Sequence, residues 1–505
     1  MHSLPEVLEH HASQIGDHPA LQDIRTSYSY SELWYWANLL ADELRGRKVH
    51  RLGLAGDNSP AWVAVDIACR VAGITCVPIP VFFSSRQVSH IGQSAGLDAV
   101  VSDDPALLAG FEAPVEPLTP KVWFCALPGS ANATSDLGDI ARITFTSGST
   151  GSPKGVCLTA QHLDQTVFAL RARLADLRLQ RHLCVLPLAT LLENIAGVYL
   201  PLMMGATVVI RRLSDLGFTG SSQLEVGRLM AAFEEVLPES AILVPEIAHQ
   251  LVASVRAGRE LPASLRFLAV GGGKVSPALL AEATVLGLPL YEGYGLSECG
   301  SVVALNVPGC HRPGSVGKPL CHVGVTVKDR GRIVVAGSVF GGYLDQGRYR
   351  ETTVDTGDLG YLDADGYLYV NGRSKNLLIT SFGRNINPEW LESELKCLPD
   401  LLQCLVFGDG EPRPHGLVVV PPGTDIDALV AGVQDLNATL PDYARLQDIY
   451  IGTTPFSHDN GYLTANGRLK RSAIIENFDV ILPSCKRPTT SPLQTTQRGI
   501  HNEVF

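Results

Sequence analysis

Several features that would assign a chain to a particular class are missing from these 505 residues. No stretch reaches the roughly 20 uninterrupted apolar residues that a transmembrane helix needs. The N-terminal stretch, MHSLPEVLEHHASQIGDHPAL, carries His and Glu where a signal peptide requires an apolar segment. We therefore expect a soluble, cytoplasmic protein without a transmembrane segment.

Cysteine patterns typical of metal or redox sites are also missing. The eleven cysteines are scattered, with no CxxC pair and no metal-type spacing to histidine. Many lie in apolar runs, such as Cys184 in HLCVLPL. This distribution predicts buried, reduced thiols of the kind found in cytosolic proteins.

Basic character is scarce, because the formal net charge is −11 and Lys and Arg form no run or stripe. This excludes an extended nucleic-acid surface. Hydrophobic residues make up 45% and charged residues 18%, an ordinary globular composition. The length calls for two or more domains.

What the chain does contain is a repeated strand–helix–strand pattern. Residues 27–46 predict a short strand followed by an amphipathic helix that ends at Gly46. Residues 51–80 alternate strand, helix and strand, which is typical of a βαβ unit in a parallel sheet. After about residue 310, short strands with Gly and Asp turns predict a small antiparallel, β-barrel-like unit.

The pattern therefore predicts an α/β fold with two domains. Residues 1–374 form the large N-terminal domain in this prediction, and residues 375–482 form a small, mobile α+β domain. Within the latter we expect helices at 388–397 and 425–439. Residues 483–505 are polar without periodicity, which predicts a flexible tail.

The segment TFTSGSTGSPKGV, residues 144–156, concentrates hydroxyl side chains, glycines and a lysine. Gly148 and Gly151 let the backbone approach an anion, and successive N–H groups can form a nest for phosphate oxygens. Lys154 adds a positive charge, and Gly155 stands where a Walker loop requires Ser or Thr. A flexible Ser/Gly linker is the alternative, but strand-like residues on both sides argue against it.

This loop resembles the phosphate-binding loop of the adenylate-forming (AMP-binding) superfamily, which includes acyl-CoA synthetases, nonribosomal-peptide adenylation domains and luciferases. Four more segments resemble that family in the same order: AVGGGKVSPALL at 269–280, YEGYGLSECG at 291–300, DTGDLGYLDADGYLYVNGRSKN at 355–376 and LTANGRLKR at 463–471. The resemblance spans roughly residues 25–480 and is closest in texture to medium- and long-chain fatty acyl-CoA synthetases.

The resemblance implies a site for ATP and Mg²⁺. Tyr294 offers a π face to a base, and Glu298 offers a hard carboxylate to Mg²⁺. Asp358 is similar to the family's ribose-binding carboxylate, while Asp363 and Asp365 fit a hairpin turn better. The residues implied to contact the nucleotide are Thr146, Ser147, Gly148, Ser149, Thr150, Gly151, Lys154, Gly271, Gly272, Gly273, Glu292, Gly293, Tyr294, Gly295, Ser297 (usually Thr in the family), Asp358, Arg373 and Lys470.

The resemblance also implies two half-reactions. A carboxylate attacks the α-phosphorus of ATP to give acyl-AMP and pyrophosphate, with Lys470, Thr150 and Glu298 as catalytic residues and the last two as metal ligands. The small domain then rotates about a hinge at Lys375. That rotation would bring Gly383 and Arg384 to the entry for the thiol of CoA.

The acid itself is less well specified. Residues 186–206, LPLATLLENIAGVYLPLMMGA, are almost wholly apolar and favour an apolar acid. Thr190 stands where fatty acyl-CoA synthetases usually carry His, and no segment resembles the FDxS of amino-acid-activating relatives. The residues expected to line the acyl site are Thr190, Leu191, Asn194 and Gly295.

Three functions stay open at this stage. The first is an acyl-CoA synthetase for a fatty or other apolar acid, aromatic acids included. The second is an acyl-AMP ligase that passes the acyl group to a carrier protein or an amine. The third is a non-catalytic relative, which the intact motif residues argue against: Lys154, Glu298, Asp358 and Lys470.

Overall fold

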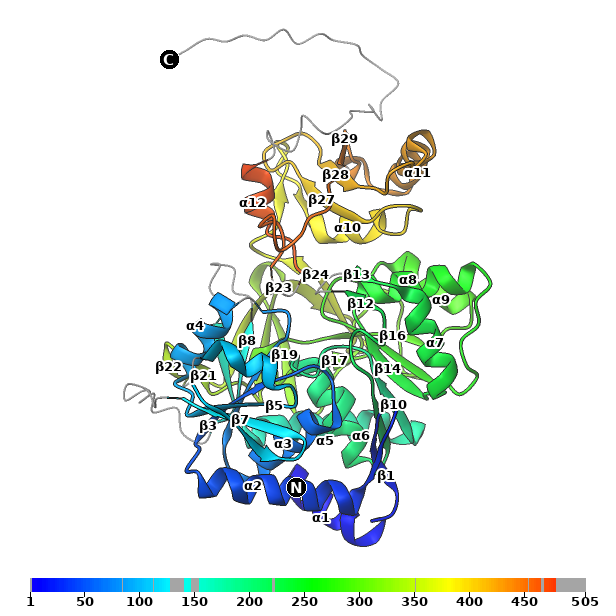
Figure 1. The fold of residues 1–505 in the computed structure, drawn as a ribbon. Helices are drawn as coiled ribbons and strands as arrows, with labels where there is room; N and C mark the ends of the chain where they lie inside the picture. Colours follow the sequence, from blue (N-terminus) through cyan, green and yellow to red (C-terminus); the bar gives the residue numbers. More distant parts are fainter. Residues whose placement is uncertain are drawn as a thin grey trace. The chain divides into compact units, whose positions relative to one another are not determined.

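The computed structural model describes residues 2–83, 85–111, 113–127, 140–146, 154–219, 223–349, 351–452, 454–464 and 467–477. The chain divides into two compact units, Met1–Ser374 with Thr464–Arg468 and Lys375–Leu463 with Leu469–Phe505. The predicted fold class is confirmed, since a large α/β domain precedes a smaller domain of helices and strands (Figure 1).

The first sheet of the large unit has nine strands within the described residues. Its six central strands run parallel, whereas the edge strands β2, β17 and β18 pair antiparallel. In spatial order the strands are β18 (Lys318–Pro319), β17 (Ala304–Leu305), β16 (Leu290–Tyr294), β15 (Phe267–Val270), β14 (Ser240–Leu243), β10 (Arg181–Cys184), β11 (Thr207–Ile210), β1 (Pro19–Gln22) and β2 (Ser27–Ser29).

The second sheet has nine strands in the same part of the chain, and only β8, β4, β3 and β5 form its parallel centre. The βαβ unit predicted over residues 51–80 is confirmed as β3, helix α3 and β4. The strands in order are β22 (Gly347–Arg348), β21 (Gly342–Tyr343), β9 (Lys154–Thr159), β8 (Ile140–Thr146), β4 (Thr75–Ile79), β3 (Arg51–Ala55), β5 (Ala99–Ser102), β7 (Val122–Ala126) and β6 (Val115–Thr119).

A third, antiparallel sheet of four strands follows where the sequence changes texture. Its order is β19 (Val323–Lys328), β20 (Arg332–Gly337), β23 (Thr353–Leu362) and β24 (Leu368–Arg373). The DADG segment is the turn between β23 and β24, as predicted, with Asp363 and Asp365 both paired to Arg312. A short hairpin, β12 (Phe218–Thr219) with β13 (Gln223–Leu224), completes the strands of this unit that the structure describes.

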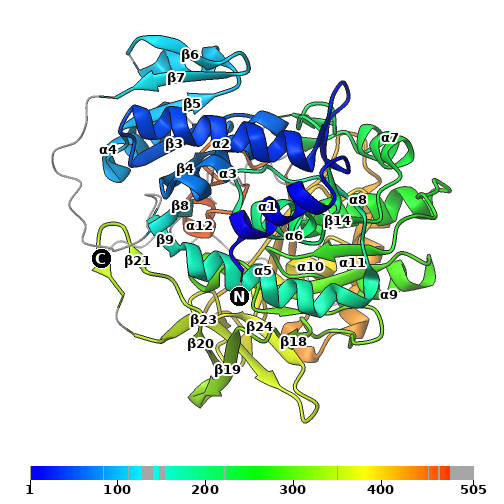
Figure 2. The same ribbon diagram turned by 90° about the horizontal axis from the view of Figure 1, so that it is seen from below.

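Helices α1, α2, α3, α5 and α9 of the large unit begin at a Ser or Thr whose side chain caps the first turn. The helix predicted to end at Gly46 is confirmed, and Ser29 and Glu32 form a capping box at its start. Helices α1, α2 and α3 pack side by side, as do α7, α8 and α9 beside β14 (Figures 1 and 2). Their bounds are α1 (Leu4–Gln14), α2 (Tyr30–Gly46), α3 (Pro60–Ala72), α4 (Ser85–Ala95), α5 (Ala160–Leu174), the π-helix η3 (Glu193–Tyr199), α6 (Leu200–Met203), α7 (Val226–Val236), α8 (Pro245–Arg256) and α9 (Pro277–Val285).

One continuous core joins the large sheets. It contains buried side chains from both nine-stranded sheets and from helices α1, α2, α3 and α5, among them Leu52, Trp62, Leu158, Leu163 and Val208. Strands such as β11 and β14 are buried along their whole length, which explains why they read as unbroken apolar runs.

The smaller unit has its own core. A mixed sheet of β27 (Gln403–Phe407), β28 (His415–Val419) and β29 (Ile449–Gly452) packs against α10 (Pro388–Leu395) and α11 (Ile426–Thr439). Both predicted helices are present, although α10 ends two residues early. The smaller unit also contains the hairpin of β25 (Leu378–Ile379) and β26 (Asn385–Ile386), the 3-10 helix η6 (Asp442–Ala444) and the helix α12 (Arg471–Glu476).

Within the described residues, the structure shows neither a disulfide nor a helix that could span a membrane. No disulfide joins the cysteines in these ranges, and seven of them are buried: Cys69, Cys76, Cys125, Cys157, Cys184, Cys299 and Cys404. No helix in the same ranges has the length and apolar character to span a bilayer.

Candidate nucleotide and acyl site

The phosphate-loop motif joins two antiparallel strands, β8 and β9. Thr146 and Lys154 face each other as the last pair of this hairpin, and the Thr146 hydroxyl lies 3.5 Å from the Lys154 carbonyl oxygen. The loop between them contains the predicted residues Ser147, Gly148, Ser149, Thr150 and Gly151, which lie outside the described residues. The hairpin thus holds Thr146 and Lys154, the described residues on either side of this loop, opposite each other.

Glu298 is linked to this hairpin through a tyrosine. The Tyr343 hydroxyl donates to Glu298 Oε1 at 2.8 Å, and Lys154 Nζ lies 5.5 Å from the centre of the Tyr343 ring. Burial and the Glu298 carboxylate raise the pKa of Tyr343, so this hydroxyl stays protonated as a donor. Sequence reasoning missed Tyr343, because it lies outside every recognised motif; β21 brings it beside β9.

Asp358 and Arg373 are register partners on β23 and β24. Arg373 Nε lies 3.0 Å from Asp358 Oδ1, and the Tyr294 hydroxyl donates to Oδ2 at 2.6 Å. Burial, and to a lesser extent the negative charge of Asp358, raises the pKa of Tyr294. Two of the recognised motifs therefore meet at the Asp358 carboxylate. The Tyr294 hydroxyl donates its hydrogen bond to Asp358.

The glycine segment after β15 supplies tight turns. Gly272 has a φ of +83°, in the left-handed region that favours glycine. A Cβ on Gly295 would lie 1.6 Å from the Ser301 carbonyl oxygen, so this position excludes any side chain. Gly271, Gly273, Gly293 and Ser297 lie in the same β15–β16 region of the first sheet.

Glu292 lies on β16 with only 3% of its surface exposed. Burial raises the pKa of its carboxyl to about 7, while nearby Lys274 and a backbone N–H of Val275 act in the opposite direction. Its Oε2 is buried and has no hydrogen-bond partner. A carboxyl with this pKa would exchange its proton near neutral pH.

On the acyl side, Thr190 closes a turn and donates its hydroxyl to the Pro187 carbonyl at 2.7 Å. Leu191 is buried, and Asn194 is fully buried with its amide donating to Asp66 Oδ2 at 2.8 Å. Asp66 also accepts from Tyr199 at 2.8 Å and pairs with Arg142. This network was not foreseen, since its members lie far apart in the sequence.

Lys470 and the predicted acceptor residues belong to the smaller unit. Lys470 is exposed, directly precedes α12, and donates its backbone N–H to Tyr462 at 2.9 Å. Gly383 has a φ of +71°, and its N–H and that of Arg384 bond to Thr380. Lys375 is exposed and is the first residue of this unit.

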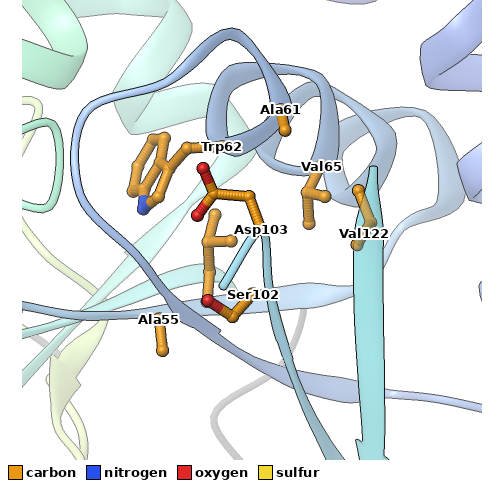
Figure 3. Close-up of a pocket in the computed structure, with 8 residues that line it drawn as sticks. Ala55, Ala61, Trp62, Val65, Ser102, Asp103 and Val122 are labelled. Carbon is orange, nitrogen blue, oxygen red and sulfur yellow. The ribbon is translucent and has the colours of Figure 1, made fainter. Parts of the chain in front are cut away.

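A small hollow near β3 and β5 is unrelated to these residues. Trp62, Val65 and Asp103 line it together with Ala55 and Ser102, and Asp103 lies beside Trp62 (Figure 3). It has no room for a water molecule, so it is not a substrate cavity.

Comparisons with known proteins identify relatives of this chain. The 2-succinylbenzoate–CoA ligase of Staphylococcus aureus (strain MRSA252) is 26% identical, covering 79% of this chain and 85% of its own. The long-chain-fatty-acid–CoA ligase FadD15 of Mycobacterium bovis is 27% identical, covering 83% and 84%. The solved structure of O-succinylbenzoate coenzyme A synthetase (MenE) from Bacillus subtilis, in complex with ATP and a magnesium ion, has a TM-score of 0.72 at 21% identity, covering 92% and 98%.

Two family models account for nearly the whole chain. One, described as AMP-binding enzyme C-terminal domain, matches residues 375–483. The other, described as AMP-binding enzyme, matches residues 8–344 and so includes the β8–β9 hairpin, β16 and Glu298. The chain belongs to the AMP-binding enzyme family.

Proposed function

We propose that this enzyme is an acid–thiol ligase, which activates a carboxylic acid with ATP and transfers the acyl group to CoA. The observation that carries the proposal is the convergence of three motifs in one unit: Asp358 between Arg373 and Tyr294, and Glu298 linked through Tyr343 to Lys154. The relatives named above, called CoA ligases or synthetases, support the same conclusion.

The nucleotide would be held by hydrogen bonds from its ribose and by charge at its phosphates. Arg373 and Tyr294 hold the Asp358 carboxylate in place, and this carboxylate would accept the ribose hydroxyls. Lys154 and the hydroxyl-rich loop would surround the phosphates. These contacts bring two anions, the acid and ATP, into one site.

The residues present fit a magnesium ion. The Tyr343 hydroxyl donates to one carboxylate oxygen of Glu298. The other oxygen has no hydrogen-bond partner among the described residues and would bind a cation that prefers oxygen ligands. Thr150 is the second proposed ligand. Bound Mg²⁺ would supply positive charge to the phosphate oxygens.

In the first step, an oxygen of the acid attacks the α-phosphorus, the bond from that phosphorus to the β-phosphate oxygen breaks, and pyrophosphate leaves. Lys470 would stabilise the charge that develops on the reacting oxygens. In the second step, the CoA sulfur attacks the acyl carbon and AMP leaves. Lys375 would be the hinge between the steps, with Gly383 and Arg384 beside the thiol.

We propose an apolar acid, either aliphatic or aromatic. Residues 186–206 are largely buried and apolar, which suits an apolar tail. One relative named above is called a long-chain-fatty-acid ligase and another a 2-succinylbenzoate ligase, so both classes are represented at similar identity. Thr190 is smaller than the histidine of fatty acyl-CoA synthetases, which would suit an aryl group beside the carboxylate.

The test is pyrophosphate release across a panel of aliphatic, aryl and aryl-dicarboxylic acids, repeated with CoA and completed by product mass. We expect release with one class of acid and a thioester only when CoA is present. Lys470→Ala should lower adenylation by roughly 100- to 1,000-fold. The matched surface variant Lys328→Ala should not change it, and release without any thioester would refute CoA as the acceptor.

The hinge is tested separately with Lys375→Pro. Proline restricts the backbone dihedral angles on which a rotation depends. Acyl-AMP formation should persist while thioester formation is lost. Equal loss of both steps would contradict a hinge at this position.

A further inference from the structure

A second cluster of ligating side chains lies inside the large unit, outside every nucleotide motif. His182 and Cys184 stand two residues apart on β10, so their side chains point to the same face of the sheet. Glu193 is the first residue of the π-helix η3. One ligand atom from each of the three lies within 4.8 Å of the others, and all three residues are buried.

Two polar atoms of this cluster lack a hydrogen-bond partner. They are His182 Nε2 and Glu193 Oε1, which lie 3.6 Å apart. The other imidazole nitrogen, Nδ1, lies 2.9 Å from Ser240 Oγ, and the other carboxylate oxygen accepts from the Leu186 N–H at 3.3 Å. The remaining partners therefore orient the side chains so that the two unpaired atoms face each other. Unpaired buried polar atoms of this kind call for an ion or water between them.

The backbone leaves space at the same place. A Cβ on Gly197 would lie 2.5 Å from Glu193 Oε1 and 2.9 Å from His182 Nε2, so any side chain there would fill the cluster. Gly197 is part of the π-helix, an irregular turn that is frequent at functional sites. Its carbonyl oxygen also lies 3.6 Å from Cys184 Sγ. Helix geometry and side chains thus converge on one point.

We propose that His182, Cys184 and Glu193 form a binding site for a zinc-type divalent cation. The donor set of one imidazole, one thiolate and one carboxylate is typical of Zn²⁺, and the sulfur disfavours Mg²⁺. A thiolate and a carboxylate together neutralise a divalent ion, which matters because the site is buried. The ligand atoms close in by about 1 Å to reach normal zinc distances.

The ion would fasten the π-helix to β10. Ser240 acts as the outer partner that holds the imidazole with Nε2 toward the ion, as is usual for metal-bound histidine. The fourth position is left to water or to the Gly197 carbonyl. The alternative is a metal-free cluster in which the Cys184 thiol, whose pKa is raised by burial and by Glu193, packs against the Glu193 carboxyl group.

The experiment measures metal directly, on the full chain purified without a histidine tag from zinc-supplemented medium. We expect about one zinc per chain by mass spectrometry after dialysis against buffer. Glu193→Gln and Cys184→Ser should each lower the zinc content at least tenfold. Cys125→Ser, a buried cysteine outside the cluster, is the matched control and should retain the ion.

A second measurement keeps the test decisive if a variant does not fold. Chelator-treated wild type is titrated with Co²⁺, and a sulfur-to-cobalt charge-transfer band should appear and then disappear when Zn²⁺ is added. Less than one zinc per ten chains without such a band would overturn the site and leave the metal-free cluster. Full zinc retention by Glu193→Gln would overturn it too. Neither readout requires ATP or an acid, so the result is independent of the proposed function.

Discussion

The same three side chains, an aspartate, an arginine and a tyrosine, occur together twice in the large unit. Asp66 pairs with Arg142 at Oδ1 and accepts from Tyr199 at Oδ2, while Asp358 pairs with Arg373 at Oδ1 and accepts from Tyr294 at Oδ2. The surroundings differ. The Arg142 side chain is 1% exposed and the Arg373 side chain 56% exposed.

We interpret the Asp66 trio as a structural brace and the Asp358 trio as part of the proposed nucleotide site. At Asp66 the Asn194 amide takes a further acceptor position inside the core. At Asp358 the partner strand β24 ends at the exposed Arg373, although the Asp358 side chain itself is only 6% exposed. The two trios therefore differ in the exposure of their arginines, and under the proposed function only the Asp358 trio would contact a ligand.

The largest effect should come from Asp66→Ala. It would leave the buried Arg142 without its counter-ion, and breaking a buried pair in this way costs about 3–5 kcal/mol. Chemical denaturation should show that loss as a lower unfolding midpoint. A change below about 1 kcal/mol would mean that Asp66 is not a brace.

Asp358→Asn should act on catalysis instead. The substitution would weaken the hydrogen bonds to the nucleotide ribose and cost about 3 kcal/mol of binding free energy. The kcat/KM for pyrophosphate release should therefore fall roughly 100-fold. The control is Asp355→Asn on the same strand, where an exposed pair with Arg332 contributes little. Wild-type kinetics in the Asp358 variant would remove the distinction between the two aspartates.

Glu292 is a third buried acidic side chain, and unlike Asp66 and Asp358 it has no ion pair with an arginine among the described residues. Burial raises its pKa from 4.5 to about 7, so the folded chain holds a proton that the unfolded chain releases between these values. The stability from neutral Glu292 is complete below pH 4.5 and is lost as the pH rises through about 7. Glu292→Gln stays neutral and should gain up to about 3 kcal/mol on wild type across that window.

Unfolding at several pH values checks this prediction. The exposed control Glu260→Gln should stay within about 0.5 kcal/mol of wild type throughout. A constant difference between wild type and Glu292→Gln would show that the carboxyl titrates normally.

The smallest effects should come from the two tyrosines. Tyr199→Phe removes a hydrogen bond to a buried charge and should lower unfolding free energy by about 1.5–3 kcal/mol. Tyr294→Phe removes the equivalent bond at Asp358 and should raise the KM for ATP by roughly 3- to 10-fold, equivalent to about 1 kcal/mol. If both variants altered stability alone, the two trios would be equivalent braces.

Much of the architecture followed from local signals. The helix at residues 30–46 and the βαβ unit at 51–80 were predictable because their apolar periodicity and end signals are contained in short stretches. Asp358 and Glu298 were predicted instead from short motifs that resemble those of the family, and their roles at the nucleotide stay predictions. Contacts between distant segments left no such trace: Tyr343 reaches Glu298, and Asp66 reaches Arg142, across 45 and 76 positions.

The metal-type cluster shows the same division more sharply. His182 and Cys184 form a short H-x-C pattern, which is too weak to predict a site by itself. Glu193 joins them only because a π-helix follows the turn at Thr190. Neither the irregular helix nor the space at Gly197 can be read from periodicity, since both depend on how the segment packs against β10.

By itself, the sequence determined the fold class, the order of the motifs and the chemistry their side chains offer, because these depend on residue types at short spacing. Only the tertiary structure decided that the arginine of one trio is buried and the arginine of the other is exposed. Exposure is a property of the whole packed chain, because it depends on which distant segments cover a side chain.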